Sequence, residues 1–396
     1  MKPHHAPGTR TPRESDPVGL VLIAHHLLPN GPAERFVALA ARHHLPARYY
    51  ALPMPKQADR PFVRAISRRL LTSVFLVRRH TSDSRQQWTG AQYPRVLLSL
   101  LRDLRAASRT ERQRIVIVAF DPLAFLLALV SCGLAGIRPQ CTVLYLVDIS
   151  LHRLTKTMAG FSYRALCKFG SSRANELWVV SEQARNGVTR LVPPGYLDPT
   201  TTHVVPVPPL AFHQEIAGPL PPAAVAYVGT LTSATGADLL PGVVAIVQHL
   251  TNQPIPFHIV ASGASLDTTI RRLGKLPNVY FHDLTFSVGA LENVLHQCSV
   301  GLAMYDPERH MYDYGDSMKI KDYLAAGLRP ISTLPVRAAY ASFVRQVPYS
   351  VEGIAEGIMR ALGEVGRPAA GAALCADEDA ATCALQRVVS RFGEIL

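Results

Sequence analysis

Several features that mark other classes of protein are scarce in this sequence. Its longest apolar run, from Leu123 to Ile137, has 15 residues, whereas a membrane-spanning helix needs about 20. Six cysteines are scattered along the chain without a C-x-x-C pair, which argues against a zinc site and against a disulfide-stapled secreted domain. The first residues hold no apolar run of the kind that a signal peptide carries. We therefore expect a cytoplasmic protein with reduced thiols, attached to a membrane only peripherally if at all, and we read the run at 123 to 137 as a buried helix.

Charged residues are also sparse, at 18% of the chain against 48% hydrophobic residues. This balance allows large buried cores and excludes a globally disordered chain. A length of 396 residues exceeds one ordinary core, since domains average about 150 residues. We take two domains as the working number.

Acidic residues are depleted in the first third. Residues 1 to 115 hold 20 Lys and Arg against 7 Asp and Glu, and the remainder holds 41 − 20 = 21 against 29 − 7 = 22. Within this third, residues 60 to 80 read as an amphipathic helix with arginines between apolar residues, a pattern suited to anionic lipid headgroups. The alternative is an arginine-rich helix packed on its own domain. We expect no nucleic-acid partner, because no recognition motif is present and few aromatic residues lie among the arginines.

Apolar strands alternate with helices along the chain, a pattern that predicts parallel sheets covered on both faces. The alternation stops in a proline-dense segment, 204 to 224, and then restarts. The fold class is therefore α/β, with two doubly wound Rossmann-like domains facing each other across a cleft. The expected parts are a disordered tail (1–16), an N-terminal acceptor domain (17–208), a linker (209–222), a C-terminal nucleotide-sugar domain (223–375), and a final helix (376–396) that is a candidate to pack back on the N-terminal domain.

The stretch "DYGDSMKIKDYLAAGLRP" (313–330) places a lysine in the first turn of a predicted helix. A cation is mildly unfavourable at that positive end, so its presence suggests an anion nearby. A phosphate bound there gains free backbone N–H groups, the helix dipole and the charge of Lys319. Asp322, one turn further along, is placed to accept hydrogen bonds from ribose hydroxyls. We therefore predict a nucleotide site with Ser317 at the helix start and Tyr312 and Met318 against a base or sugar.

Other candidates lie at strand ends, where open parallel sheets bind ligands. "VGTL" supplies Gly229, Thr230 and Leu231, and "YFHDL" supplies Asp283. In the N-terminal domain, Asp148 ends the strand of "LYLVDIS", and His25 and His26 follow the first strand. Taken singly, each has an ordinary structural explanation as a loop glycine, a helix cap or a solvated side chain.

Taken together, "VAYVGTL", "FHIVASG", "NVYFHDL", "CSVGLAMYD" and "SMKIKDYLAAGLRPIST" resemble, in order and rough spacing, the nucleotide-binding half of GT-B glycosyltransferases across about residues 225 to 335. The "SMK" with a tyrosine seven residues before the lysine, and "VLIAHH", are most similar to the family 70 glucuronosyltransferase of xanthan assembly. That resemblance implies Asp148 as the catalytic aspartate. Family 4 enzymes carry Glu-x7-Glu, whereas this chain has Tyr314 and Asp322, and "TSATG" lacks their basic residue; a family 4 retaining mechanism is therefore doubtful.

The resemblance implies transfer of a sugar from a nucleoside diphosphate, a UDP-sugar by preference, to a hydroxyl of a saccharide or lipid-linked acceptor. The expected setting is bacterial exopolysaccharide or cell-surface glycan synthesis, with an anionic membrane surface as a candidate partner. An inverting reaction needs a general base, for which Asp148 is the candidate. We expect no metal and no other cofactor, because lysine and helix dipole neutralise the diphosphate. Two alternatives stay open: a nucleotide-sugar epimerase on the same fold, and a catalytically silent binding subunit.

Overall fold

The structure is a computed structural model of the 396-residue chain. It describes residues 18–24, 31–45, 47–51, 62–67, 70–75, 101–102, 104–105, 114–147, 158–210, 212, 223–251, 254–262, 266–274, 276, 278–283, 288–308, 317–364 and 366–390. The proposed tail at 1–16 lies outside these residues.

The first sheet has eight strands in the order β4-β3-β2-β1-β5-β6-β7-β8. The neighbouring strands from β2 to β8 in this order pair in parallel, while the β2–β3 and β3–β4 pairs are antiparallel. Its elements are β1 (Val18–Ala24), α1 (Pro32–Arg42), β2 (Ala47–Ala51), β3 (Phe62–Ser67), β4 (Leu70–Phe75), β5 (Arg114–Phe120), α3 (Pro122–Ala135), β6 (Cys141–Leu146), α5 (Met158–Arg173), β7 (Glu176–Val179), α6 (Glu182–Leu191), the 3-10 helix η1 (Pro194–Tyr196) and β8 (Thr202–Val204).

The second sheet has six parallel strands in the order β11-β10-β9-β12-β13-β14. Strand order reverses between β9 and β12, and such a switch point is where doubly wound sheets bind ligands. The elements are β9 (Val225–Thr230), the 3-10 helix η2 (Ser233–Thr235), α7 (Leu240–Leu250), β10 (Phe257–Ser262), α8 (Leu266–Leu273), β11 (Val279–Asp283), α9 (Val288–Leu295), β12 (Val300–Ala303), α10 (Met318–Ala325), β13 (Arg329–Ser332), α11 (Ala338–Ala341), β14 (Arg345–Gln346), α12 (Val351–Leu362) and α13 (Gly371–Ser390).

Local chemistry accounts for several helix ends. The Asp121 side chain accepts a hydrogen bond from the Ala124 N–H at 2.8 Å and starts α3. Gly136 ends the same helix with a φ of 68°, a conformation that glycine adopts without a Cβ penalty. Ser181 caps α6 in the same way, by accepting from the Ala184 N–H.

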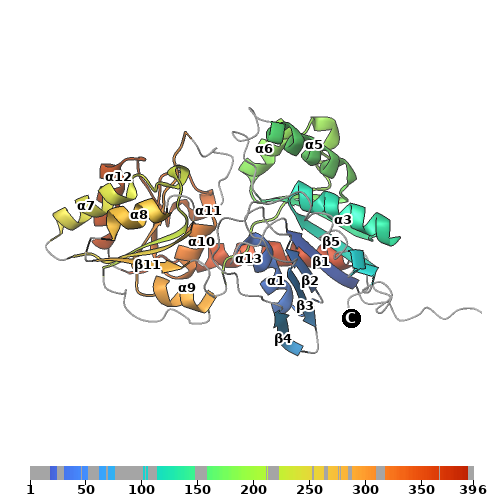
Figure 1. The fold of residues 1–396 in the computed structure, drawn as a ribbon, viewed down its shortest axis with the longest axis horizontal. Coiled ribbons are helices and arrows are strands. Elements are labelled where there is room, and N and C mark those ends of the chain that lie inside the picture. The colour runs from blue at the N-terminus through green and yellow to red at the C-terminus, as the bar shows by residue number, and fades with distance from the viewer. Residues whose placement is uncertain are drawn as a thin grey trace, which may run out of the picture.

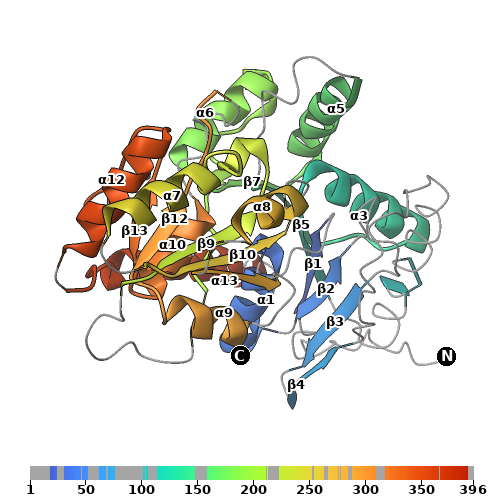
Figure 2. The ribbon, with the colours of Figure 1, turned by 60° about the vertical axis from the view of Figure 1, so that its left-hand side comes forward.

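Right-handed crossovers decide which helices share a face of the first sheet. Strands β5, β6, β7 and β8 follow one another in space, so α3, α5 and α6 lie together on one face, whereas the chain steps the other way from β1 to β2 and places α1 on the opposite face (Figure 1). Helix α13 runs beside α1 in both ribbon views (Figures 1 and 2).

Helix α13 joins the two domains. Its residue Leu374 belongs to the core of the second domain. Further along the helix, Ala381, Leu385 and Val388 are buried in the core of the first domain. The last strand of the first sheet ends at Val204, and the first strand of the second sheet begins at Val225. The exact domain boundaries at 208 and 223 stay predictions.

The expected amphipathic helix at 60 to 80 is wrong where the structure describes it. Residues 62–67 and 70–75 form the antiparallel strands β3 and β4. The segment is rich in β-branched and aromatic residues such as Val63, Ile66 and Phe75, which favour strands. Strand β2 offers an edge for them to pair with.

Candidate functional site

A lysine and a glycine meet at the switch point of the second sheet. Gly229 lies near the carboxyl end of β9 with a φ of 129°, a conformation that side chains rarely tolerate. A Cβ added to it lies 2.6 Å from Lys319 Cε and 3.0 Å from Nζ. Only glycine therefore leaves room for the lysine to lie against the strand end. The two residues predicted for the site from separate motifs are neighbours.

The ammonium of Lys319 lies between two tyrosine rings. Nζ is 4.5 Å from the ring centroid of Tyr227 and 5.0 Å from that of Tyr305, within range of a cation–π contact. It also donates to the Tyr227 hydroxyl at 3.4 Å. Within the described part of the chain, no carboxylate forms an ion pair with it. Burial lowers the pKa of Lys319 to about 7, because desolvation disfavours the charged form.

The N-terminus of α10 adds a second positive feature. Ser317 is the N-cap residue, yet its side chain makes no capping bond to the helix backbone. Its Oγ instead lies 2.7 Å from the Tyr305 hydroxyl, and the first turn holds no acidic residue. Burial raises the pKa of Tyr305 to about 12, so this hydroxyl stays neutral. The dipole end and Lys319 together form a site that suits an anion.

The loop after β9 is held by hydroxyl groups. The Thr230 carbonyl accepts from the Tyr227 hydroxyl at 2.9 Å and from Thr235 Oγ1 at 2.6 Å. Thr230 itself is exposed at the strand end, as expected of a ligand-facing residue. Leu231 is not: its side chain is wholly buried in the core of the second domain. The chain turns inward after Thr230, so a donor contact stays a prediction for the backbone of Leu231 alone.

Asp322 forms an ion pair with the other domain. Its Oδ2 accepts from Arg35 of α1 at 2.7 Å, and both side chains are almost fully buried. Its Oδ1 is buried without a hydrogen-bond partner among the described residues. A free carboxylate facing two ribose hydroxyls is thus not what the structure shows, because one oxygen is taken by Arg35. A ribose contact stays a prediction for Oδ1 alone.

Lys321, the residue before Asp322, contacts both segments that connect the domains: the chain near Val207 and helix α13. Lys321 is fully buried, and its Nζ lies 2.8 Å from the Val207 carbonyl and 2.8 Å from Asp377 Oδ2 of α13. Arg35 donates to the next carbonyl along the chain, that of Pro208, at 3.3 Å. Helix α10 is therefore fixed to α1, to the segment that precedes the linker and to α13.

The remaining predicted residues divide into two groups. Met318 packs against the core of the first domain rather than standing free. The backbone of Asp283 ends β11, two strands away from β9, about 10 Å at the usual strand spacing. The others lie outside the described residues: Asp148, His25, His26 and Tyr312.

Sequence reasoning missed three residues. Tyr227 and Tyr305 frame Lys319, and Arg35 pairs with Asp322. The signal for Arg35 is an arginine among the buried residues of α1, since a buried arginine needs a partner. A tyrosine inside an apolar strand carries no comparable signal.

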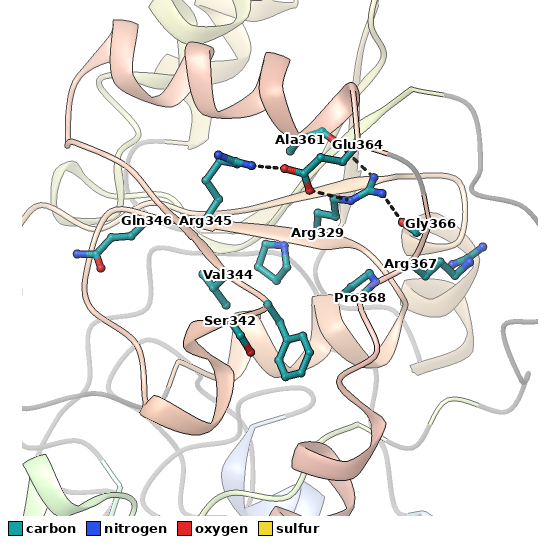
Figure 3. A pocket seen from close by; sticks show the side chains of 12 residues that line it. Arg329, Ser342, Val344, Arg345, Gln346, Ala361, Glu364, Gly366, Arg367 and Pro368 are labelled. Carbon is teal, nitrogen blue, oxygen red and sulfur yellow. Dashed lines mark hydrogen bonds and ion pairs between the residues drawn. The ribbon is translucent and has the colours of Figure 1, made fainter.

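A separate pocket of about 500 Å³ lies beside β13 and the edge strand β14 of the second sheet (Figure 3). Arg329, which begins β13, donates to the Ala361 carbonyl at 3.2 Å and pairs with Glu364 at 3.2 Å. Arg345 also pairs with Glu364. These guanidinium groups serve an internal network at the amino ends of the strands, remote from the switch point.

Comparisons with known proteins place the fold. No family model matches the chain, and no curated protein sequence matches it. Solved structures do: an OtsA apo structure (TM-score 0.57, 13% identity, 95% of this chain and 99% of that one), an E. coli trehalose-6-phosphate protein bound with UDP-2-fluoro glucose (0.56, 14%, 96% and 99%), and a putative UDP-N-acetylglucosamine 2-epimerase from Listeria monocytogenes (0.56, 10%, 95% and 97%). With its two α/β domains, each built on a largely parallel sheet, the chain has the GT-B architecture of two Rossmann-like domains.

Proposed function

We propose that this protein transfers a sugar from a nucleoside diphosphate donor to a hydroxyl of a saccharide acceptor. The observation that carries the proposal is the placement of Lys319, a cation without an acidic partner among the described residues, beside Gly229 at the switch point. An anion is the kind of ligand that suits such a site.

Each group has a stated part in the reaction. Lys319 and the N-terminus of α10 bind the diphosphate and stabilise the charge that develops on it as it leaves. Gly229 lets the backbone approach the donor. Asp148, two positions after β6 in the sequence, is the proposed general base, which makes the reaction inverting. The diphosphate charge is neutralised by the lysine and the helix dipole, so we propose a reaction without a metal.

The fold neighbours favour uridine nucleotides. One was solved with UDP-2-fluoro glucose and another is described as acting on UDP-N-acetylglucosamine. We therefore put UDP-sugars first among the donors. A lipid-linked acceptor, a place in bacterial exopolysaccharide or cell-surface glycan synthesis, and the closer likeness to family 70 are parts of the same proposal and rest on the sequence motifs.

An epimerase is the second candidate, because an epimerase structure matches the chain as well as a UDP-sugar complex does. The two activities differ in their products. A transferase releases nucleoside diphosphate only when an acceptor is present, whereas an epimerase converts the donor alone and releases none.

The test begins with thermal unfolding against a panel of nucleoside diphosphates, for the native chain, Lys319→Ala and the matched control Lys168→Ala. A ligand at 100 times its dissociation constant stabilises by about 2.7 kcal/mol, a shift of several degrees. We expect one nucleotide to shift the native chain and Lys168→Ala but not Lys319→Ala. That nucleotide's sugar conjugates are then assayed for diphosphate release with and without saccharide acceptors. No shift in a folded sample contradicts the proposal and favours the silent-subunit alternative.

A further inference from the structure

Exposed apolar side chains gather on one part of the first domain. Among the described residues, eight large hydrophobic side chains are exposed, and three of them are scattered over the second domain. The other five belong to α3, α5 and the neighbouring η1: Val130 (39% exposed), Leu134 (56%), Phe161 (74%), Phe169 (37%) and Tyr196 (40%). We call this set the α3–α5 face. Such a cluster on a protein surface marks an interaction site more often than scattered apolar residues do.

The two helices that carry most of this face lie side by side. Helices α3 and α5 pack against each other on one side of the first sheet (Figure 1), so their outward surfaces both face away from it. Helix α3 buries Ala124, Phe125 and Ala128 and turns Val130 and Leu134 outward. The expected buried helix at 123 to 137 is therefore buried on one side, and its outer side is not covered by any part of the chain that the structure describes.

Helices α3 and α5 themselves carry charges of a single sign, while exposed acidic side chains lie beside them at Asp198, two residues after Tyr196, and at Glu182 of α6. Helices α3 and α5 have 14 and 16 residues and hold no Asp or Glu. Exposed on α5 are Arg164, Lys168 and Arg173. Two more exposed arginines lie at the far end of α3: Arg138, three residues beyond it, and Arg105, which donates to the Leu134 carbonyl at 2.6 Å.

Aromatic rings lie among these cations. Lys168 Nζ is 4.5 Å from the ring centroid of Tyr196, and the Arg173 guanidinium is 5.9 Å from that of Phe169. Apolar side chains for the acyl boundary, a tyrosine for the headgroup level and basic residues for lipid phosphates are the features of a surface that lies on an anionic bilayer.

We propose that the α3–α5 face docks the protein on an anionic membrane surface. The face lies on the bilayer rather than spanning it: none of the helices in the described part of the chain has the length and apolar character to cross one. A second copy of the chain is a poor occupant, because a two-fold interface sets a patch against itself and here brings cations against cations. The proposal does not depend on the donor site, although a lipid-linked acceptor is reached at the same surface.

The experiment is flotation of the full chain with vesicles of phosphatidylcholine alone and of phosphatidylcholine mixed with phosphatidylglycerol. The apolar variant is Leu134→Ser with Phe161→Ser, and its matched control is Leu250→Ser, which is equally exposed on the second domain. The charge variant is Arg164→Gln, Lys168→Gln and Arg173→Gln. Its control is Arg271→Gln with Arg272→Gln, two exposed arginines of α8.

We expect the native chain and both controls to float with the anionic vesicles, and less so as salt is raised. Each basic residue near such a surface contributes about fivefold to binding, so the charge variant is expected to bind at least tenfold more weakly. The apolar variant is expected to lose binding to a similar degree. Thermal unfolding with and without nucleotide, measured on the same samples, shows whether the variants are folded and whether they bind nucleotide like the native chain. A loss of flotation can then be assigned to the substituted surface and not to the donor site.

Three outcomes overturn the proposal. The native chain does not float with anionic vesicles at low salt. Alternatively, both variants float like the native chain, which assigns attachment to another segment such as the basic residues 60 to 80. Or sedimentation shows a native dimer that Leu134→Ser with Phe161→Ser converts to a monomer, which makes the face a protein interface.

Discussion

Nucleotide binding at Lys319 should depend on pH in the neutral to alkaline range. Burial holds the pKa of this lysine at about 7 in the free protein, well below the value near 10.4 of an exposed lysine. Only the protonated form carries the charge that a diphosphate pairs with. Above about pH 7 the ligand must therefore bind together with a proton, and its apparent affinity falls as the proton becomes scarce.

The size of the effect follows from this pKa. If only the protonated form binds, the apparent dissociation constant scales with 1 + 10^(pH − 7), which is about 4 at pH 7.5 and about 320 at pH 9.5. We thus expect about a 75-fold loss of affinity as an upper limit over these two pH units. The terminal phosphate of the ligand titrates near pH 6 and does not change in this range. Tyr305, with its pKa raised to about 12, stays neutral as well.

Calorimetric titration of UDP into the protein measures this loss directly. Repeating the titration at pH 8 in buffers of different ionisation enthalpy counts the protons taken up, and we expect nearly one. Lys319→Arg, which stays charged throughout, is the matched control and should give a flat profile. A flat profile in the native protein, with no proton uptake, would refute the reasoning even if Lys319→Ala weakens binding. The sign for stability is opposite: between about pH 7 and 10.5 the unfolded chain binds more protons, so the free protein gains stability as pH rises.

Two further predictions concern the neighbours of this lysine. Gly229→Ala places a methyl group 2.6 Å from Lys319 Cε and is expected to weaken UDP binding at least tenfold by calorimetry, whereas Gly133→Ala, whose Cβ meets no atom within 4 Å, leaves it unchanged. Arg35→Ala strands a buried carboxylate and is expected to lower the free energy of unfolding by about 3–5 kcal/mol in urea titrations, while Arg35→Met combined with Asp322→Leu costs much less; equal losses would show that the pair is not the cause.

The sequence was informative where structure depends on neighbours along the chain. Strands and helices alternate in the second domain as predicted, because their apolar periods of two and about 3.6 residues are local properties. That Gly229 and Lys319 lie at the same edge of the sheet was also predictable, since the carboxyl ends of parallel strands share one edge. Both residues carry a local anomaly, a glycine in a strand and a cation at the positive end of a helix.

What the sequence did not reveal depends on which distant segments come together. Arg35 and Asp322 are 287 positions apart, and no local pattern links them. The segment of β3 and β4 has apolar spacings that also suit a helix, and the edge of β2 decides for strands. Helix α3 is apolar all round, which predicts burial, yet the described residues cover only one side of it.

Helix α10 carries both Lys319 and the residues that connect the two domains. Its first turn carries Lys319, at the proposed donor site, and the residues that follow, Lys321 and Asp322, bond to the Val207 carbonyl, to α13 and to α1. A buried cation such as Lys321 is tolerated only while its partners stay in place, because breaking a buried pair leaves an uncompensated charge. The helix therefore cannot shift at its first turn without disturbing the bonds that hold both crossings between the domains. Asp322, the acid expected to bind ribose, therefore also holds the two domains together through its ion pair with Arg35.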